Sequence, residues 1–284
     1  MEQAGPPSLE LNTAKSFENV LKKGSTKGAG TPVIAFFEDA NDPLINQYAD
    51  GANHVREDYQ FYHVYGANVK KVGGVMGQLR IYQKPHLQSK FEKPFLAMEL
   101  ADKEAKDVKE FVISGTLPLV GHYTKATAKY YDDNAPYCLV FTTVDFSWDY
   151  VKETQMVRNK VLQVAKNYRT DVIFAVADDE EFAELMKKFN LHDSGEDVNV
   201  GCKGKDGLHY PMPEDELDVD TLGEFIADFV KGKAKAFIKS KPIPKKQGDV
   251  IEVVGKSFND VVMVKDKVST IFVELSYQRF KRTY

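Results

Sequence analysis

The chain repeats one kind of structural unit. Short apolar stretches at Pro32–Phe37, Pro136–Phe141 and Thr270–Leu275 each follow an amphipathic stretch that is typical of a helix. The first two stretches begin 104 residues apart, which is the length of one compact domain rather than of one solenoid repeat. The 284 residues therefore predict two complete domains and the beginning of a third.

The order of elements is the same in both complete units. The β-branched and aromatic residues of Val33–Phe37 predict a strand buried on both faces. In the second unit we expect a helix at residues 123–131, a strand at 137–144 and a long helix from about Tyr150 to Tyr168. Each unit is predicted to run strand, helix, strand, helix, strand, hairpin and closing helix. This order predicts an α/β fold.

Charge is distributed unequally and excludes several kinds of partner. Residues 6–117 carry 14 charges of each sign, residues 118–239 carry 15 basic against 22 acidic, and residues 240–284 carry 9 basic against 5 acidic. A net charge of −4 without clustered basic residues argues against a nucleic-acid surface. No apolar run reaches the roughly 18 residues of a membrane helix. The six histidines are scattered without the spacing of a metal site, so we expect no metal and no cofactor.

The order of elements and four short stretches of the sequence resemble a known protein family. A unit of this order is the thioredoxin arrangement, a mixed central sheet with helices on both faces. The stretches Leu117–His122, Ser194–Asn199, Lys239–Pro244 and Val253–Phe258 resemble protein disulfide isomerases of the endoplasmic reticulum. Within a large member with three catalytic domains, the chain resembles the two non-catalytic domains, called b and b-prime, followed by the start of a catalytic domain. The resemblance implies residence in the endoplasmic reticulum lumen, although no targeting or retention signal is visible.

The resemblance gives four segments. We expect a b-like domain at 6–117, a b-prime-like domain at 118–240, a Pro- and Lys-rich linker at 241–248, and a truncated catalytic-type domain at 249–284. In this last segment Glu274 matches a buried glutamate of the family, while Phe280 and Thr283 stand at its cysteine positions. Such a short fragment is expected to be ordered only if it docks elsewhere.

The residues of the family's chemistry are missing from both complete units. A thioredoxin-type catalyst places a cysteine at the N-terminus of a helix, where the helix dipole lowers the pKa of its thiol. On the family pattern, Asn41 and Leu44 stand at the cysteine positions of the first unit, and Asp145–Asp149 fills the corresponding region of the second. No Cys-x-x-Cys pair occurs anywhere in the sequence. We therefore expect this chain not to be an enzyme.

Large apolar residues near the empty catalytic position suggest a binding site. They could form a groove for an unfolded peptide, and the resemblance favours this because b-prime domains of several isomerases bind clients. The alternative is that the aromatic residues only hold the long helix against the sheet. The candidate peptide-binding residues are Phe146, Trp148, Tyr150, Phe182, Met186 and Phe189.

The two cysteines leave a further question open. Cys138 and Cys202 both fall in strand-like stretches of the second unit, where buried, unreactive thiols are the simplest interpretation. A bridge between them requires their strands to be neighbours. An enzyme would instead require one of them to be exposed beside a base.

The sequence thus favours a non-catalytic scaffold that binds clients or chaperones. The expected partners are unfolded or misfolded client proteins and other luminal chaperones. A related isomerase binds acidic lectin chaperones through basic residues, whereas the second unit here is acidic, so we expect weak or no binding to calnexin and calreticulin. The alternative function is a calsequestrin-like calcium store, which also uses tandem thioredoxin domains but needs a far more acidic chain.

Overall fold

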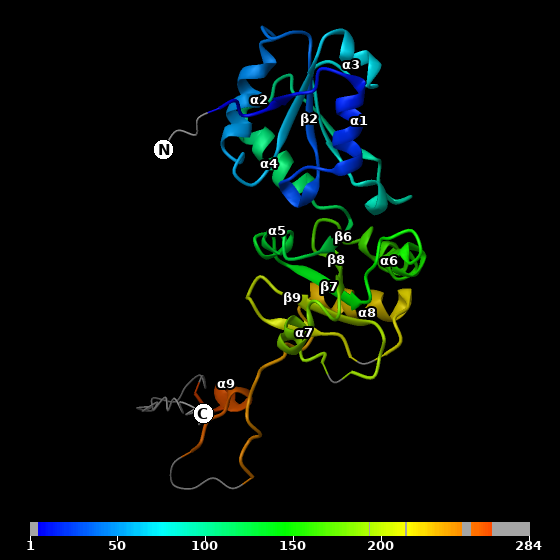
Figure 1. Cartoon of the computed structure of the whole chain (residues 1–284). Helices are drawn as coiled ribbons and strands as arrows, with labels where there is room; N and C mark the ends of the chain where they lie inside the picture. Colours follow the sequence, from blue (N-terminus) through cyan, green and yellow to red (C-terminus); the bar gives the residue numbers. More distant parts are fainter. Residues whose placement is uncertain (1–4, 193, 214, 246–250, 263–284) are drawn as a thin grey trace, which may run out of the picture. The chain divides into compact units, whose positions relative to one another are not determined.

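The computed structural model describes residues 5–192, 194–213, 215–245 and 251–262. The chain divides into two compact units, Met1–Ala236 and Phe237–Tyr284, and each is described separately below. The compact unit Met1–Ala236 contains two five-stranded sheets, and each sheet has helices on both faces (Figure 1). The α/β class and the tandem thioredoxin-like architecture are therefore confirmed.

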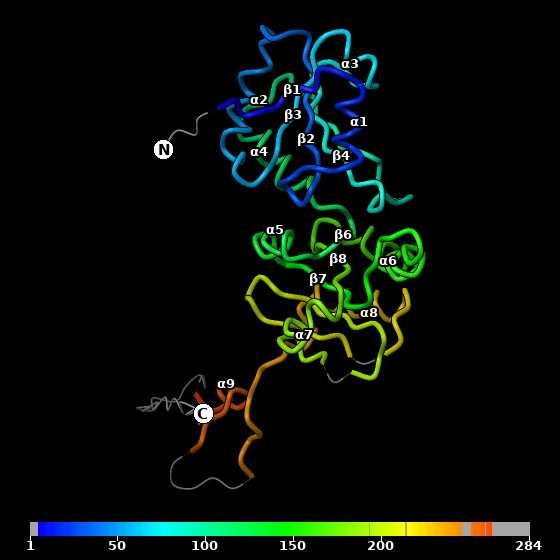
Figure 2. The backbone as a smooth tube through the Cα atoms, in the orientation of Figure 1, coloured from blue at the N-terminus to red at the C-terminus, as the bar shows by residue number. Residues whose placement is uncertain are grey.

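The first sheet has the strand order β1-β3-β2-β4-β5, and Figure 2 shows β1, β3, β2 and β4 side by side. β1 and β2 run parallel to β3, whereas β4 runs antiparallel to β2 and to β5. The strands are β1 (Leu9–Glu10), β2 (Val33–Phe37), β3 (Phe61–Tyr65), β4 (Gln78–Tyr82) and β5 (Phe95–Glu99). The helices are α1 (Ala14–Lys23), α2 (Leu44–Asn53), α3 (Ala67–Lys71) and α4 (Ala105–Gly115), with 3₁₀ turns η1 (Gly28–Gly30) and η2 (Pro85–Leu87).

Strand β2 organises the core of this domain. Its alternating side chains enter two hydrophobic clusters, one on each face of the sheet. Val33 and Phe37 pack with residues of α2 and α4, whereas Ile34 and Phe36 pack with Phe17 of α1 and with residues of α3. All five residues of β2 are buried, as the apolar run predicts.

The second sheet repeats the first, with the order β10-β9-β7-β8-β6. β6 and β7 run parallel to β8, and β9 runs antiparallel to β7 and to β10. Its strands are β6 (Val120–Tyr123), β7 (Tyr137–Thr142), β8 (Ile173–Asp178), β9 (Asn199–Lys203) and β10 (His209–Pro211). Its helices are α5 (Ala128–Asp132), α6 (Val151–Ala165), α7 (Ala183–Phe189) and α8 (Val219–Val230). Helices α6 and α8 cover one face, and α5 and α7 cover the other.

One predicted helix is partly wrong. Residues 123–131 were expected to form a single helix, but Tyr123 ends β6, which pairs with β8, and α5 begins only at Ala128. Val120 and Tyr123 are residues with strong strand preference. The edge of the parallel sheet therefore overrides the amphipathic pattern.

In the compact unit Phe237–Tyr284, the described part is small. Turn η3 (Gly255–Ser257) leads into α9 (Phe258–Val261), and the backbone N–H of Lys256 donates to Ser240 Oγ at 3.0 Å. The predicted strand Thr270–Leu275, together with Glu274, Phe280 and Thr283, lies outside the described residues.

Candidate functional site

The loops after β2 and β7 occupy the place where a thioredoxin-type catalyst carries its cysteines. In the first domain this loop is closed by Asp42, whose carboxylate accepts hydrogen bonds from the N–H groups of Glu38 and Leu44, both at 3.0 Å. A carboxylate thus caps the start of α2, at a helix end that would otherwise stabilise a thiolate. No cysteine lies in either loop, so neither can begin thiol exchange.

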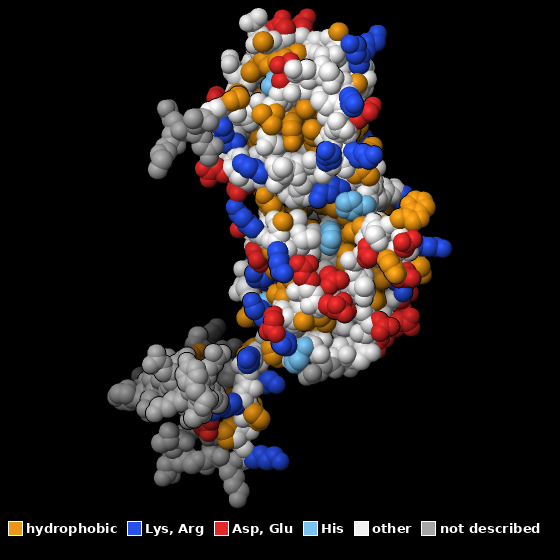
Figure 3. All heavy atoms as spheres, viewed as in Figure 1, with side chains coloured by type: hydrophobic (Ala, Val, Ile, Leu, Met, Phe, Trp, Pro, Cys, Tyr) orange, Lys and Arg blue, Asp and Glu red, His pale blue; other side chains and the backbone are white. Residues whose placement is uncertain are grey.

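The second loop presents aromatic side chains instead. Thr154 on α6 is buried, and its hydroxyl is bonded to both the N–H and the carbonyl of Asp145 at 2.9 Å, which fixes the start of the loop. The rest of the loop is exposed to solvent. The side chain of Trp148 is 92% exposed and that of Tyr150 is 56% exposed. Around α6, hydrophobic side chains (orange) lie among Asp and Glu side chains (red) in Figure 3.

Phe146 differs from these two residues. Its ring is half-buried and contacts two imidazoles, with ring centroids 4.7 Å from His86 and 5.1 Å from His122. Burial lowers the pKa of both histidines, and the pKa of His122 falls to about 4, with a smaller contribution from the neighbouring His86. At neutral pH both rings are therefore uncharged, and Phe146 packs in an apolar contact between the two domains.

The predicted wall of the groove belongs mainly to a hydrophobic core. Phe189 has no exposed surface and Met186 is 8% exposed, and both belong to the cluster between α5, α7 and the sheet. Phe182 is half-buried against Tyr123, with ring centroids 5.0 Å apart. Phe146 packs on the cluster of the opposite face. The six candidate residues therefore do not gather in one hydrophobic cluster, and only Trp148 and Tyr150 present large exposed aromatic surface.

The contact between the two domains was not predicted from the sequence. Arg158 on α6 is completely buried, and it donates hydrogen bonds to the carbonyls of Leu87 and Val120 and to Gln155 Oε1. Gln155 Nε2 donates to the carbonyl of His86 at 2.6 Å. These contacts join turn η2 of the first domain to α6 and β6 of the second. The signal was Arg158's position, three and four residues before the apolar Val161 and Leu162, on the face of α6 that enters the core.

A second set of contacts joins the two domains through α5. The hydroxyl of Tyr130 donates to the carbonyl of Asp58 at 2.6 Å and accepts from the N–H of Gly28 at 3.0 Å. Gly28 has φ +65°, and a Cβ atom there would lie 2.8 Å from the ring of Tyr59. Glycine is required at this position both for its backbone conformation and for the close approach.

The two cysteines form a disulfide. Cys138 on β7 and Cys202 on β9 stand directly opposite each other in the antiparallel pair, with Cα atoms 3.9 Å apart, and both are completely buried. The interpretation as free thiols is therefore wrong, because the sheet makes their strands neighbours. Neither sulfur offers a free thiol as a nucleophile.

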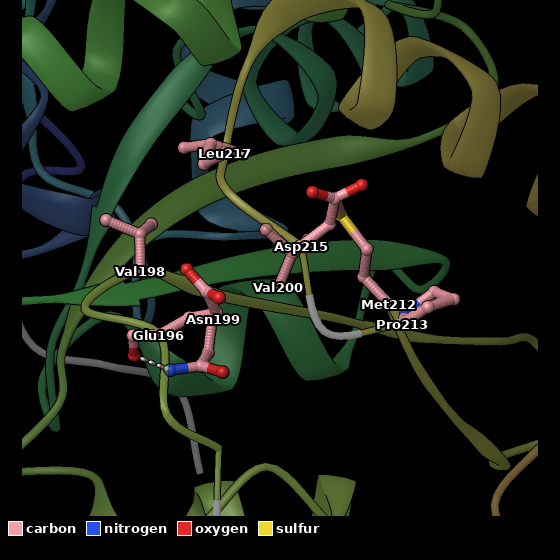
Figure 4. A pocket seen from close by; sticks show the side chains of 8 residues that line it. All are labelled: Glu196, Val198, Asn199, Val200, Met212, Pro213, Asp215 and Leu217. Carbon is pink, nitrogen blue, oxygen red and sulfur yellow. Dashed lines mark hydrogen bonds between the residues drawn. The ribbon is translucent and has the colours of Figure 1, made fainter.

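One hollow of the second domain is very small, and the described residues form no metal centre. Figure 4 shows the side chains that line this hollow, among them Asn199, Met212 and Asp215. Its volume is about 10 Å³, which leaves space for a single water at most. No group of three or more possible metal ligands occurs among the described residues. None of the described helices is long and apolar enough to cross a membrane.

Comparison with known proteins decides the family. A sequence model of the thioredoxin-like domain matches residues 37–228, and the bovine protein disulfide-isomerase A4 is 42% identical over 266 residues. The crystal structure of the bb fragment of ERp72 superposes with a TM-score of 0.74 at 36% identity, covering 81% of this chain and 100% of that one. The chain belongs to the protein disulfide isomerase family. The chain is also 41% identical to the human protein disulfide-isomerase A4 over 267 residues.

The match covers most of this chain but less than half of each of these isomerases. It includes 93% of this chain but only 40% of the bovine and of the human relative. The solved fragment, in contrast, is covered completely. The similarity to the isomerases thus runs through both described sheets and extends over a limited part of the longer relatives.

Proposed function

We propose that this chain is the non-catalytic, client-binding section of a protein disulfide isomerase of the endoplasmic reticulum lumen. Its two thioredoxin-like domains, at 6–117 and 118–240, keep catalytic domains apart, and residues 241–248 link them to a catalytic-type segment at 249–284. The second domain binds unfolded or misfolded client segments and other luminal chaperones. Binding to calnexin and calreticulin is expected to be weak, because the second domain is acidic, with 15 basic against 22 acidic residues.

The exposure of Trp148 carries this proposal. A side chain of this size that is 92% exposed gains free energy when a partner removes it from water, and Trp is among the residues that contribute most at interfaces. Tyr150, which is 56% exposed, extends the same surface. Phe146 and Thr154 hold the loop in place, while Phe182, Met186 and Phe189 support the second domain from its opposite face.

The contacts between the two domains also support a spacer role. Arg158, Gln155 and Tyr130 hydrogen-bond to backbone carbonyls of the first domain. A spacer must resist bending between its domains, and hydrogen bonds across the domain contact, of which the one from Arg158 to Leu87 is buried, oppose such bending. The calcium-store alternative gains no support from the structure, and the named relatives are isomerases.

Trp148 provides the test. Because it is the only tryptophan, its fluorescence emission should shift to shorter wavelength when an unfolded, apolar peptide covers it. The substitution Trp148→Ala should weaken binding of that peptide, measured by calorimetry, by about 1–2 kcal/mol, while leaving the melting temperature unchanged because the side chain is exposed.

Val75→Ala is the matched control, since Val75 is an exposed apolar residue of the first domain. It should leave the affinity unaltered. An emission spectrum that does not move at saturating peptide, or equal losses from both substitutions, would contradict a client-binding role for Trp148.

A further inference from the structure

A second hollow lies on the second domain, bounded by the end of β10, the segment after it and α8. Its volume is about 430 Å³. Four of its lining residues, Thr221, Glu224, Phe225 and Asp228, are spaced i, i+3, i+4 and i+7 along α8, so that they share one face of the helix. This hollow is large enough for an extended side chain with its neighbouring backbone.

The hollow has an apolar floor. Met212 and Phe225 are largely buried beneath it, and Pro211 lies on its wall as the last residue of the edge strand β10. Such a floor can accept the methylene groups of a long side chain.

The wall formed by β10 offers acceptors rather than donors. The N–H of Met212 donates to the carbonyl of Val200 at 2.8 Å, so Met212 directs its backbone groups toward β9. Pro211, one residue earlier, faces the free edge by the alternation of antiparallel pairing. Neither Pro211 nor Pro213 has an N–H group. This edge therefore offers few N–H donors to a neighbouring strand, whereas the carbonyl oxygen of Pro211 can accept a hydrogen bond from a ligand.

The rim of the hollow is mainly acidic. Asp215, Glu224 and Asp228 are exposed, and within the described ranges none of the ion pairs includes them. Asp215 uses one oxygen to accept from the N–H of Glu216 at 2.9 Å. Two exposed ammonium groups, Lys233 and Lys235, lie at the end of the hollow beyond α8. The part between α8 and Asp215 thus combines carboxylates, the carbonyl of Pro211 and an apolar floor.

We propose that this hollow binds an arginine or lysine side chain within an extended, apolar peptide segment. The methylene groups of that side chain lie over Phe225 and Met212, and its charged end donates to Glu224, Asp228 and the carbonyl of Pro211. The proposal rests on the proposed function as a client-binding module. It adds a second surface and a chemical preference for cationic segments flanked by apolar residues.

Three capped peptides of eight residues test this preference on the full chain. They are identical except that arginine, glutamine or glutamate stands between two leucines. The arginine peptide should bind most tightly, and its binding should shift the NMR amide signals of Phe225, Asp228 and Ala234. The double substitution Glu224→Gln/Asp228→Asn should weaken its binding about three- to ten-fold, and should leave the glutamine peptide unaffected.

The matched control is Glu18→Gln/Glu110→Gln, which removes two exposed charges from the first domain. It should change the affinity less than two-fold, and both double variants should keep the wild-type melting temperature. Equal affinity for the three peptides, equal losses from both double variants, or amide shifts confined to other elements would overturn the proposal. If the glutamine peptide then still moved the Trp148 emission, the proposed function would stand without this surface. If no peptide bound anywhere, both would fail.

Discussion

Replacing both cysteines, as Cys138→Ala/Cys202→Ala, is expected to lower the free energy of unfolding of the second domain by about 4 kcal/mol. The two residues are 64 positions apart, so the bridge closes a long loop and removes much of the freedom of the unfolded chain. It also ties β7 to β9 within the hydrophobic core shared with α6 and α8. Urea unfolding followed by far-ultraviolet circular dichroism measures the loss, because Trp148 is already exposed in the native protein and its emission changes little on unfolding.

Reduction should act like the double substitution, but only after the domain opens. Both cysteines are completely buried, so a dithiol reductant and a maleimide probe should reach them in urea and not in the native protein. If the reductant left the urea midpoint of the wild type unchanged, or if native protein were labelled as rapidly as unfolded protein, the bridge would not be the buried cross-link of this structure.

Arg158→Met is expected to lower the free energy of unfolding by about 3 kcal/mol. Burial lowers the pKa of Arg158 to about 10, so the guanidinium remains charged at neutral pH, stabilised by its hydrogen bonds to Leu87, Val120 and Gln155. Methionine fills part of the volume but cannot replace the hydrogen bonds that Arg158 donates to the carbonyls of two buried residues, and the loss of such buried hydrogen bonds is costly. The same change should loosen the two domains, because Leu87 and Val120 belong to different ones.

Two measurements separate these effects. Urea unfolding gives the loss of stability, and native-state hydrogen exchange at η2 and β6 should increase if the domain contact loosens. Lys187→Met is the control, since Lys187 pairs with Glu184 on the surface of α7 at 2.5 Å and its loss should cost less than about 0.5 kcal/mol. Similar costs for both substitutions would show that Arg158 is not a structural link.

Most of the fold followed from local patterns in the sequence. The apolar runs of β2 and β7 and the cap and Gly24 at the ends of α1 are strong signals, because burial on both faces and helix termination each demand particular residues. Helix α3 was missed because its five residues carry no side-chain cap. Strand β6 was missed because only its pairing with β8 distinguishes it from a helix start.

The candidate site was harder to predict, for reasons of three-dimensional register. The pairing of Cys138 with Cys202 depends on which residues of β7 and β9 stand opposite each other, and spacing along the chain does not determine that. Phe189 and Trp148 are both large aromatic residues near helix ends, yet one is buried and the other exposed. Their difference arises from the direction of each side chain relative to the sheet. Arg158 required knowledge of which carbonyls the neighbouring domain brings to α6.

The most direct test of the account is whether the purified chain exchanges disulfides in a substrate protein. A scrambled, multiply bridged substrate is incubated with the chain in a glutathione buffer, and the recovery of native substrate activity is followed. Because both empty catalytic loops lack cysteine and the only two cysteines are joined in a buried bridge, we predict recovery at the rate of buffer alone. Recovery that rises with the concentration of the chain would contradict the account of a non-catalytic binding scaffold.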